Sequence, residues 1–152
     1  MAIVAGAGGP LGHATAVTLS AGGLTVVAVD RNKHALRELR DGVRREVADT
    51  TDPAAAKSLI DRIAGEVGPP DVLVNTIGAF GPGDTLSTTP ETLRLMIDVN
   101  LGPALWLSRA VAPQLLDTPA SRATFPAAVM AHAGQGSAGR IHIVAIRQPA
   151  GF

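Results

Sequence analysis

The residues with the clearest chemical potential form a glycine-rich turn near the N-terminus, in the segment AGAGGPLG at residues 5–12. Glycines let a chain turn sharply and let backbone N–H groups come close to a ligand. An alanine-rich stretch follows, and a helix there would present free N–H groups and partial positive charge at its N-terminus. Such a turn suits a phosphate or pyrophosphate. The residues predicted to bind it are Gly6, Gly8, Gly9, Leu11 and Gly12.

A carboxylate supplies the second part of the pattern. An apolar run at residues 24–29 ends in Asp30, which is followed by Arg31. The spacing from Gly12 places Asp30 where an acid accepts hydrogen bonds from an adenosine ribose. Asp30 would repel a 2′-phosphate whereas Arg31 would attract one, and we expect NAD to be preferred over NADP. The order strand, turn, helix, strand and acid predicts a dinucleotide-binding βαβ unit.

Alternating strand and helix patterns must position these residues. Proline or a cap residue marks three helix starts, at Asn32, Asp52-Pro53 and Thr89-Pro90. Strands are predicted at residues 2–5, 24–29, 45–48, 72–74 and 140–146. The first helix is predicted to end near residue 21. Three more are predicted at residues 33–40, 53–67 and 89–117, and the last of them has a break near 102–103.

Polar residues at the end of a buried strand indicate where a ligand would lie. Asn75, Thr76 and Gly78 follow the apolar run at residues 72–74, and such a strand end suits a ligand crevice. The loop at residues 79–88 is long enough to be mobile. Residues 118–139 read as a flexible connection with a short helix at 126–133. The whole chain, residues 1–152, is predicted to form one domain.

Composition narrows the class of protein. The 152 residues carry 13 basic and 13 acidic side chains, so no charge excess favours nucleic acid or an anionic membrane as partner. A hydrophobic content of 46% with only 3% aromatic residues is typical of parallel strands under helices. There is no cysteine, no histidine pair has metal-ligand spacing, and no apolar run approaches about 18 residues. We expect a soluble, cytoplasmic protein without a metal.

Taken together, the motifs resemble the short-chain dehydrogenase/reductase family. The resemblance covers nearly the whole chain to Ile146, with the motifs in family order and at family spacing. It implies an α/β fold: a Rossmann-like, doubly wound parallel sheet of about five strands in the order 3-2-1-4-5, with helices on both faces as a three-layer sandwich. The matching segments are residues 6–12, Asp30, Asp49-Thr50, DVLVNTIG at 71–78 and MIDVNLGPALWLSRAVAP at 96–113.

The resemblance also implies roles for single residues. Asp49, with Thr50 beside it, matches the family acid that contacts the adenine amino group. Asn75 and Gly78 match the ends of a family motif near the nicotinamide ribose, and Thr76 lies between them. Asn100 matches the active-site asparagine of a water-linked proton relay. Asp30 resembles the acid of NAD-preferring members, and the G-x-x-G-x-x-G spacing resembles the extended and atypical branches.

The sequence departs from the family pattern in its catalytic residues. It contains no tyrosine and no lysine after Lys57, and the family serine position falls on or near Ile146. Family chemistry uses those three side chains for proton transfer and for holding the substrate carbonyl. We therefore expect a chain that is truncated before the family Tyr-x-x-x-Lys segment. For such a chain we expect self-association into a homo-oligomer, a missing C-terminal segment that acts as its partner, or low stability.

Three functional hypotheses remain open. The first is a shortened NAD(P)-dependent oxidoreductase that would transfer hydride between nicotinamide and an alcohol or ketone. The second is a binding module or pseudoenzyme that holds the dinucleotide without turnover. A methyltransferase that uses S-adenosylmethionine is a weaker third hypothesis, since a glycine turn followed by an acid suits that cofactor too.

Overall fold

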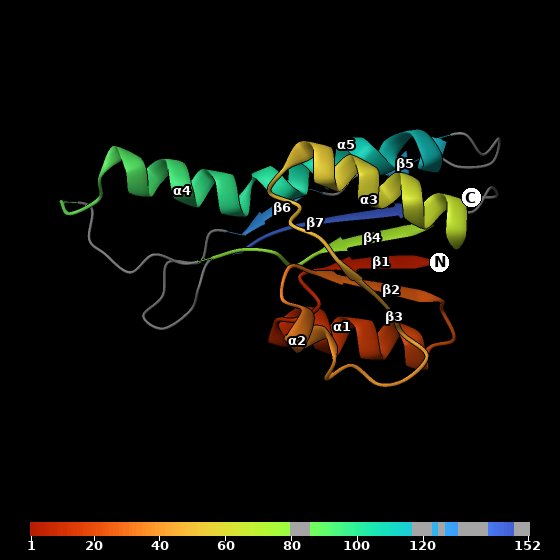
Figure 1. Cartoon of the computed structure of the whole chain (residues 1–152). Coiled ribbons are helices and arrows are strands. Elements are labelled where there is room, and N and C mark those ends of the chain that lie inside the picture. The colour runs from red at the N-terminus through yellow and green to blue at the C-terminus, as the bar shows by residue number, and fades with distance from the viewer. Residues whose placement is uncertain (80–85, 117–122, 125–126, 131–139, 148–152) are drawn as a thin grey trace.

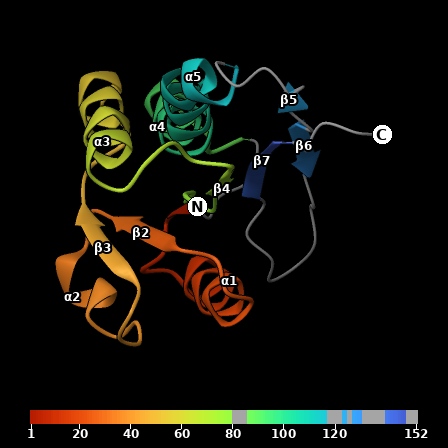
Figure 2. The same ribbon diagram turned by 90° about the vertical axis from the view of Figure 1, so that its right-hand side faces the viewer.

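The architecture is a β-sheet between two layers of helices (Figures 1 and 2). The computed structural model describes residues 1–79, 86–116, 123–124, 127–130 and 140–147. The strands are β1 (Ala2–Ala5), β2 (Val26–Asp30), β3 (Arg44–Val47), β4 (Val72–Asn75), β5 (Ala123–Thr124), β6 (Ala127–Met130) and β7 (Arg140–Arg147). The helices are α1 (Pro10–Ala21), α2 (Lys33–Leu36), α3 (Pro53–Glu66), α4 (Pro90–Asn100) and α5 (Gly102–Leu116).

The four strands β3-β2-β1-β4 form the parallel part of the sheet. Ala2 pairs with Val26 on one side and with Val72 on the other, so β1 lies at the centre. The chain moves outward from β1 to β3 and then returns to the opposite side of β1 through α3. This order confirms the predicted α/β fold and the 3-2-1-4 part of the predicted strand order.

The predicted fifth strand differs in direction. It lies beside β4 as expected, but β7 pairs with β4 in antiparallel register, with Val72 opposite Ile146. Two short strands precede it, and both β5 and β6 are antiparallel to β7. They therefore run in the direction of β4, and the chain reverses before β7. The expectation that all five strands would be parallel was wrong because this reversal leaves no signal in the apolar pattern of the strand itself.

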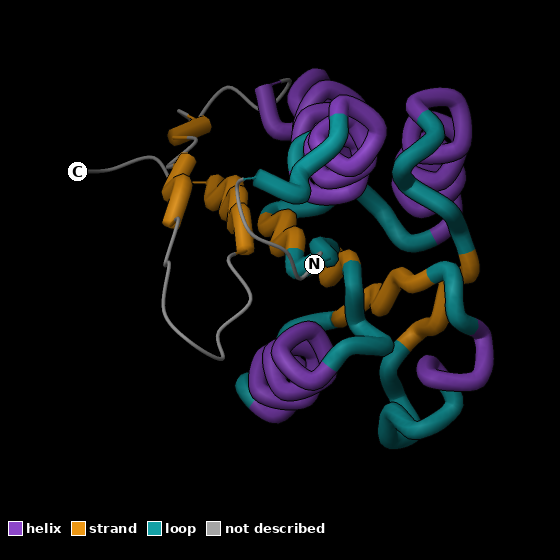
Figure 3. The backbone as a smooth tube through the Cα atoms, turned by 90° about the vertical axis from the view of Figure 1, so that its left-hand side faces the viewer, coloured by secondary structure: helices purple, strands orange, loops and turns teal. Residues whose placement is uncertain are grey.

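Helices lie on both faces of the sheet (Figure 3), and an apolar layer holds them on each face. On the face that carries α3 and α5, Leu59, Ile60 and Ile63 are fully or almost fully buried against Ile3 and Leu73. The opposite layer packs α1 and α2 against the sheet through Val4, Ala16, Val26, Ala28 and Leu36. Each layer uses aliphatic side chains of strands buried on both faces, as parallel strands require. These two layers confirm the three-layer sandwich.

The predicted caps explain where three helices begin. The Asn32 side chain accepts hydrogen bonds from the N–H groups of His34 and Ala35, and Asp52 accepts one from Ala54. Thr89 accepts one from the N–H of Thr92 at the start of α4. Each cap satisfies N–H groups that have no partner within the helix.

Two helix predictions need correction. The helix predicted at residues 33–40 ends at Leu36, because the guanidinium of Arg45 binds the carbonyl oxygens of Leu36, Leu39 and Arg40. The short helix predicted at residues 126–133 is wrong where the structure describes it, since residues 127–130 form β6. The rest of that segment, the predicted connection at 118–139 apart from β5 and β6, and most of the predicted loop at 79–88 lie outside the described residues.

Candidate functional site

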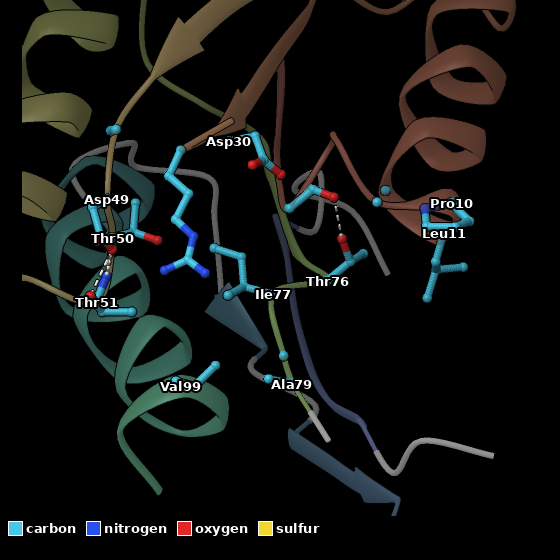
Figure 4. A pocket seen from close by; sticks show the side chains of 16 residues that line it. Pro10, Leu11, Asp30, Asp49, Thr50, Thr51, Thr76, Ile77, Ala79 and Val99 are labelled. Atoms are coloured by element: carbon cyan, nitrogen blue, oxygen red, sulfur yellow. Dashed lines mark hydrogen bonds between the residues drawn. The ribbon is translucent and has the colours of Figure 1, made fainter. Parts of the chain in front are cut away.

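A cavity of about 320 Å³ lies at the carboxyl ends of the four parallel strands (Figure 4). It opens where the strand order changes direction. From β1 the chain continues to β2 and β3 on one side, and β4 lies on the other side of β1. Ligands of doubly wound sheets bind at such a switch point. The cavity is lined by Gly6, Gly9, Pro10, Leu11, Gly12, Asp30, Arg31, Ala48, Asp49, Thr50, Thr51, Thr76, Ile77, Gly78, Ala79 and Val99.

The glycine turn between β1 and α1 forms one wall of this cavity. Gly6 has φ +81°, a left-handed conformation that side chains rarely adopt. A Cβ atom at Gly12 would collide with the carbonyl oxygen of Gly6, so the start of α1 packs directly on the turn. The hydroxyl of Thr76 donates to the carbonyl oxygens of Ala5 at 2.9 Å and Gly6 at 3.2 Å. The turn is thereby fixed to the end of β4.

The first turn of α1 offers donors to this space. Gly9 is the N-cap residue and Pro10, which has no N–H, is the first helical residue. The first bond of the helix runs from the N–H of His13 to the carbonyl of Gly9. The N–H groups of Leu11 and Gly12 have no hydrogen-bond partner within the part of the chain that the structure describes. Free donors and the partial positive charge of a helix end make an anion-binding surface.

Asp30 ends β2 at the rim of the cavity, with both carboxylate oxygens held by backbone. Oδ2 accepts a hydrogen bond from the N–H of Gly8 at 2.9 Å. Oδ1 accepts one from the N–H of Asn32 at 2.8 Å. Each carboxylate oxygen can accept a further bond. The side chain is therefore oriented while part of its capacity stays available to a ligand.

A second carboxylate, Asp49, lies just beyond the end of β3. Its Oδ1 accepts from the hydroxyl of Thr51 at 2.6 Å and from the N–H of the same residue at 3.1 Å. These bonds, with the attraction of the Arg31 guanidinium, outweigh burial and hold the pKa of Asp49 below its ordinary value. The carboxylate is thus kept ionised, and Oδ2 remains available for a donor on a ligand.

Asn100 connects the end of α4 to the strand that ends at the cavity. Its Oδ1 accepts from the N–H of Ala79 at 3.2 Å, and its Nδ2 donates to the carbonyls of Ala79 at 3.0 Å and Met96 at 2.8 Å. A Cβ atom at Gly78 would lie 2.8 Å from Oδ1, so glycine is needed for this approach. Asn100 itself does not line the cavity but fixes the backbone of Ala79, which does.

The structure brings ten of the twelve residues predicted to bind a dinucleotide to one cavity. Gly8 and Asn75 are the exceptions. Asn75 is completely buried, and its Oδ1 accepts from the N–H of Ile77. Sequence reasoning missed six lining residues, of which Thr51 had a local signal because a threonine two positions after an aspartate often bonds back to it. The others are Pro10, Ala48, Ile77, Ala79 and Val99.

Outside this cavity, the described residues offer few groups suited to other functions. Among the described residues, no group of three or more His, Asp or Glu side chains could hold a metal ion. No helix in the described part of the chain is long and apolar enough to cross a membrane. Lys57 lies on α3, where it pairs with Asp61 and lines a separate cavity between α3 and α5.

Sequence comparisons place the chain among dehydrogenases. A family model described as "short chain dehydrogenase" matches residues 1–139. The chain is 32% identical over 124 residues to 2,3-dihydro-2,3-dihydroxybenzoate dehydrogenase of Bacillus subtilis, covering 77% of this chain and 48% of that protein. It is 36% identical over 126 residues to 1-deoxy-11-beta-hydroxypentalenate dehydrogenase of Streptomyces avermitilis, covering 77% and 47%. The chain spans about half the length of the curated relatives it matches.

Solved structures give the same result. A short-chain dehydrogenase from Streptomyces avermitilis superposes with a TM-score of 0.70 at 30% identity, over 75% of this chain and 43% of that one. Aldohexose dehydrogenase from Thermoplasma acidophilum superposes with a TM-score of 0.68 at 29% identity, over 74% and 43%.

Proposed function

Since this chain belongs to the short-chain dehydrogenase family of oxidoreductases, we propose that it binds NAD in the cavity at the carboxyl ends of β1 to β4. The observation that carries the proposal is the convergence of a glycine turn, free N–H groups and two oriented carboxylates on one cavity. Each group suits a different part of a dinucleotide.

The wall made by α1 suits the pyrophosphate. The free N–H groups of Leu11 and Gly12 would donate to its oxygens, and glycine at position 9 leaves backbone open at the same wall. Asp30 would accept from the hydroxyls of the adenosine ribose, and Asp49 would accept from the adenine amino group. Thr50 lines the same end of the cavity.

The other end of the cavity suits the nicotinamide half. Thr76, Ile77, Gly78 and Ala79 follow β4 there, and Asn100 fixes the backbone of Ala79. The nicotinamide ring supplies a hydride acceptor or donor when it is bound. We propose that the family reaction, hydride transfer between nicotinamide and an alcohol or ketone, is the reaction class of the whole protein, with Asn100 as a residue of the active site.

Two charges near the ribose decide between NAD and NADP. Asp30 would repel a 2′-phosphate, and its two backbone hydrogen bonds keep it at the ribose position. Arg31 would attract a 2′-phosphate, but its guanidinium lies within reach of the negative charge of Asp49. This arrangement favours NAD.

A second candidate function is dinucleotide binding without turnover. The 152 residues include no tyrosine, and Lys33 and Lys57 are the only lysines. Lys57 belongs to the α3–α5 cavity rather than to the proposed cofactor site. This chain alone therefore lacks a tyrosine–lysine pair to move a proton at a substrate oxygen. The methyltransferase hypothesis has less support, because the matched family consists of dehydrogenases.

Calorimetric titration of the purified chain with NAD, NADP and S-adenosylmethionine tests the binding proposal. We expect saturable heat with NAD, weaker binding of NADP, and no binding of S-adenosylmethionine. Heat with S-adenosylmethionine alone would support the methyltransferase instead. No heat with either nicotinamide dinucleotide would overturn the proposed function.

Incubation with NADH and a panel of ketones, followed at the absorbance of NADH, tests turnover by this chain. We expect no oxidation above background, because no tyrosine is present to donate the proton. Oxidation that scales with protein concentration would contradict the binding-only alternative.

A further inference from the structure

Gly8 belongs to the glycine turn but does not line the cavity. It is not among the glycines with positive φ, which are Gly6, Gly23, Gly42 and Gly68 in the described residues. Neither close approach to a ligand nor backbone conformation therefore explains why a glycine stands there. Its contacts give a different reason.

The space around Gly8 is filled by two side chains of the neighbouring β2–α2 segment. A Cβ atom at Gly8 would lie 2.8 Å from Cβ of Ala35 and 2.9 Å from both Cγ and Oδ2 of Asp30. Real Cβ atoms essentially never come so close to other heavy atoms, so any side chain at this position would have to displace its neighbours. Both of the Asp30 atoms in this contact belong to its carboxylate.

The backbone of Gly8 also orients this carboxylate. Its N–H donates to Oδ2 of Asp30, while the N–H of Asn32 donates to Oδ1. One donor precedes Asp30 in the sequence and lies in the β1–α1 turn. The other follows Asp30 and lies at the start of α2. Together they hold both oxygens, and a hydrogen bond to a carboxylate is stronger than one between neutral groups.

We propose that Gly8 is a positioning residue that selects the cofactor by holding Asp30 in place for the unphosphorylated adenosine ribose. This inference rests on the proposed function. It is narrower than the proposed function, because it concerns only the choice between a ribose diol and a ribose 2′-phosphate. The pyrophosphate is bound by other residues of the turn.

The test compares the dissociation constants of NAD and NADP, measured by calorimetry, for the wild type and Gly8→Ala. Displacing Asp30 weakens the bonds to the ribose diol and relieves the repulsion of a 2′-phosphate. We expect the NAD affinity to fall about tenfold, which corresponds to losing one hydrogen bond to a charged group, and the preference for NAD to fall at least as much. An unchanged ratio of the two constants would overturn the inference.

Gly9→Ala is the matched control in the same turn. A Cβ atom at Gly9 would meet only the carbonyl oxygen of Gly6, at an ordinary 3.4 Å, and would not contact Asp30. Gly9 lines the wall proposed for the pyrophosphate, which NAD and NADP share. We expect any change in affinity to be equal for both dinucleotides. A loss of NAD preference in Gly9→Ala as large as in Gly8→Ala would contradict the specific role of Gly8.

A double-mutant cycle shows whether Gly8 acts through Asp30. In an Asp30→Ala background the clashing carboxylate is absent, so adding Gly8→Ala should leave the NAD to NADP ratio unchanged. An equal effect of Gly8→Ala in both backgrounds would overturn the inference. If Gly8→Ala alone does not fold, Gly8→Ala with Ala35→Gly removes one of the two contacts and keeps the one to Asp30. Failure of the wild type to bind either dinucleotide would instead overturn the proposed function.

Discussion

At the scale of single residues, the proposed site is built from acids whose oxygens are held by nearby N–H and hydroxyl groups. Asp30 is held by two N–H groups and Asp49 by the hydroxyl and N–H of Thr51. Such bonds fix the orientation of both carboxylates before any ligand arrives, and at Asp49 they also favour the ionised form. The energy of ordering these side chains is thus spent during folding and not during binding.

The Asp49 carboxyl gives a direct test of this arrangement. Its pKa lies below the ordinary value because of the bonds from Thr51 and the charge of Arg31. Thr51→Val removes the hydroxyl but keeps the N–H, so we expect the pKa of Asp49 to rise towards the ordinary value. Thr51→Ser keeps the hydroxyl and should leave it low. Carbon-detected NMR titration of the Asp49 carboxyl measures both, and equal pKa values in the two variants would contradict the assignment.

Gly12 tests the packing of the turn. A Cβ atom there would collide with the carbonyl oxygen of Gly6, which is backbone and cannot move without displacing the turn. We expect Gly12→Ala to lower the free energy of unfolding by about 3 kcal/mol, a large value for one substitution. Urea denaturation measures it. Gly65→Ala is the control, because a Cβ at Gly65 in α3 meets nothing within 4 Å and alanine favours a helix.

At the scale of elements, ion pairs tie the outer strand of the sheet to a helix. Glu46 on β3 accepts hydrogen bonds from Arg44 on the same strand and Arg62 on α3, and Arg44 also reaches Glu66 at the end of α3. Burial tends to raise the pKa of Glu46, but the bonds from the two arginines outweigh it and hold this pKa below its ordinary value. The network replaces apolar packing at a strand whose side chains are largely polar.

Glu46→Gln should weaken this connection in a pH-dependent way. Because the folded pKa lies below the unfolded one, the stability from Glu46 is present above its ordinary pKa and is lost as the pH falls through the folded value. At neutral pH we expect the variant to be less stable by about 1 kcal/mol, since the arginines are partly exposed. Thermal unfolding across the acid range measures this, and a difference that persists at the lowest pH would contradict the ionic origin.

The elements also show what the sequence could predict. Caps at Asn32, Asp52 and Thr89 are local signals, and the structure confirms all three. The end of α2 depends on Arg45, which is distant from that helix end in sequence, so local patterns could not reveal it. The direction of β7 depends on the chain reversal before it and not on its own residues.

The site was predictable to a similar extent. Glycine spacing and strand ends located the residues that share the cavity, because parallel strands bring their carboxyl ends to one edge. The same patterns did not distinguish Gly8, which faces Asp30, from Gly9, which faces the cavity. The two differ only in what surrounds them, and surroundings come from tertiary structure.

At the scale of the whole molecule, α4 projects beyond the sheet and has no buried residue (Figure 1). Apolar side chains recur every four residues along α4, the junction at Leu101 and the start of α5, and each is at least 41% exposed: Leu93, Ile97, Leu101 and Leu105. The N–H of Leu101 bonds to the carbonyl of Ile97 and that of Leu105 to the carbonyl of Leu101, so helical spacing continues across the junction and keeps these residues on one face. A continuous exposed apolar face of this kind favours association.

We therefore expect this chain to self-associate at high concentration. Replacing Leu93, Ile97 and Leu105 with serine should shift the molecular mass towards that of a monomer, because apolar area is removed from the contact. Size-exclusion chromatography with light scattering measures the mass. Leu86→Ser, which changes an even more exposed leucine outside this face, is the control. A wild-type monomer at all concentrations would contradict the expectation.

The bond between Thr76 and the turn at Gly6 has a consequence for synthesis on the ribosome. The glycine turn, Asp30 and Asp49 all emerge within the first third of the chain, but the hydroxyl that holds the Gly6 carbonyl is 70 residues behind it. Until β4 has emerged and paired with β1, a nascent chain carries the chemical groups of the pocket without its shape. The proposed cofactor would therefore find a formed pocket on a nascent chain only after β4, half-way along the sequence, has joined β1.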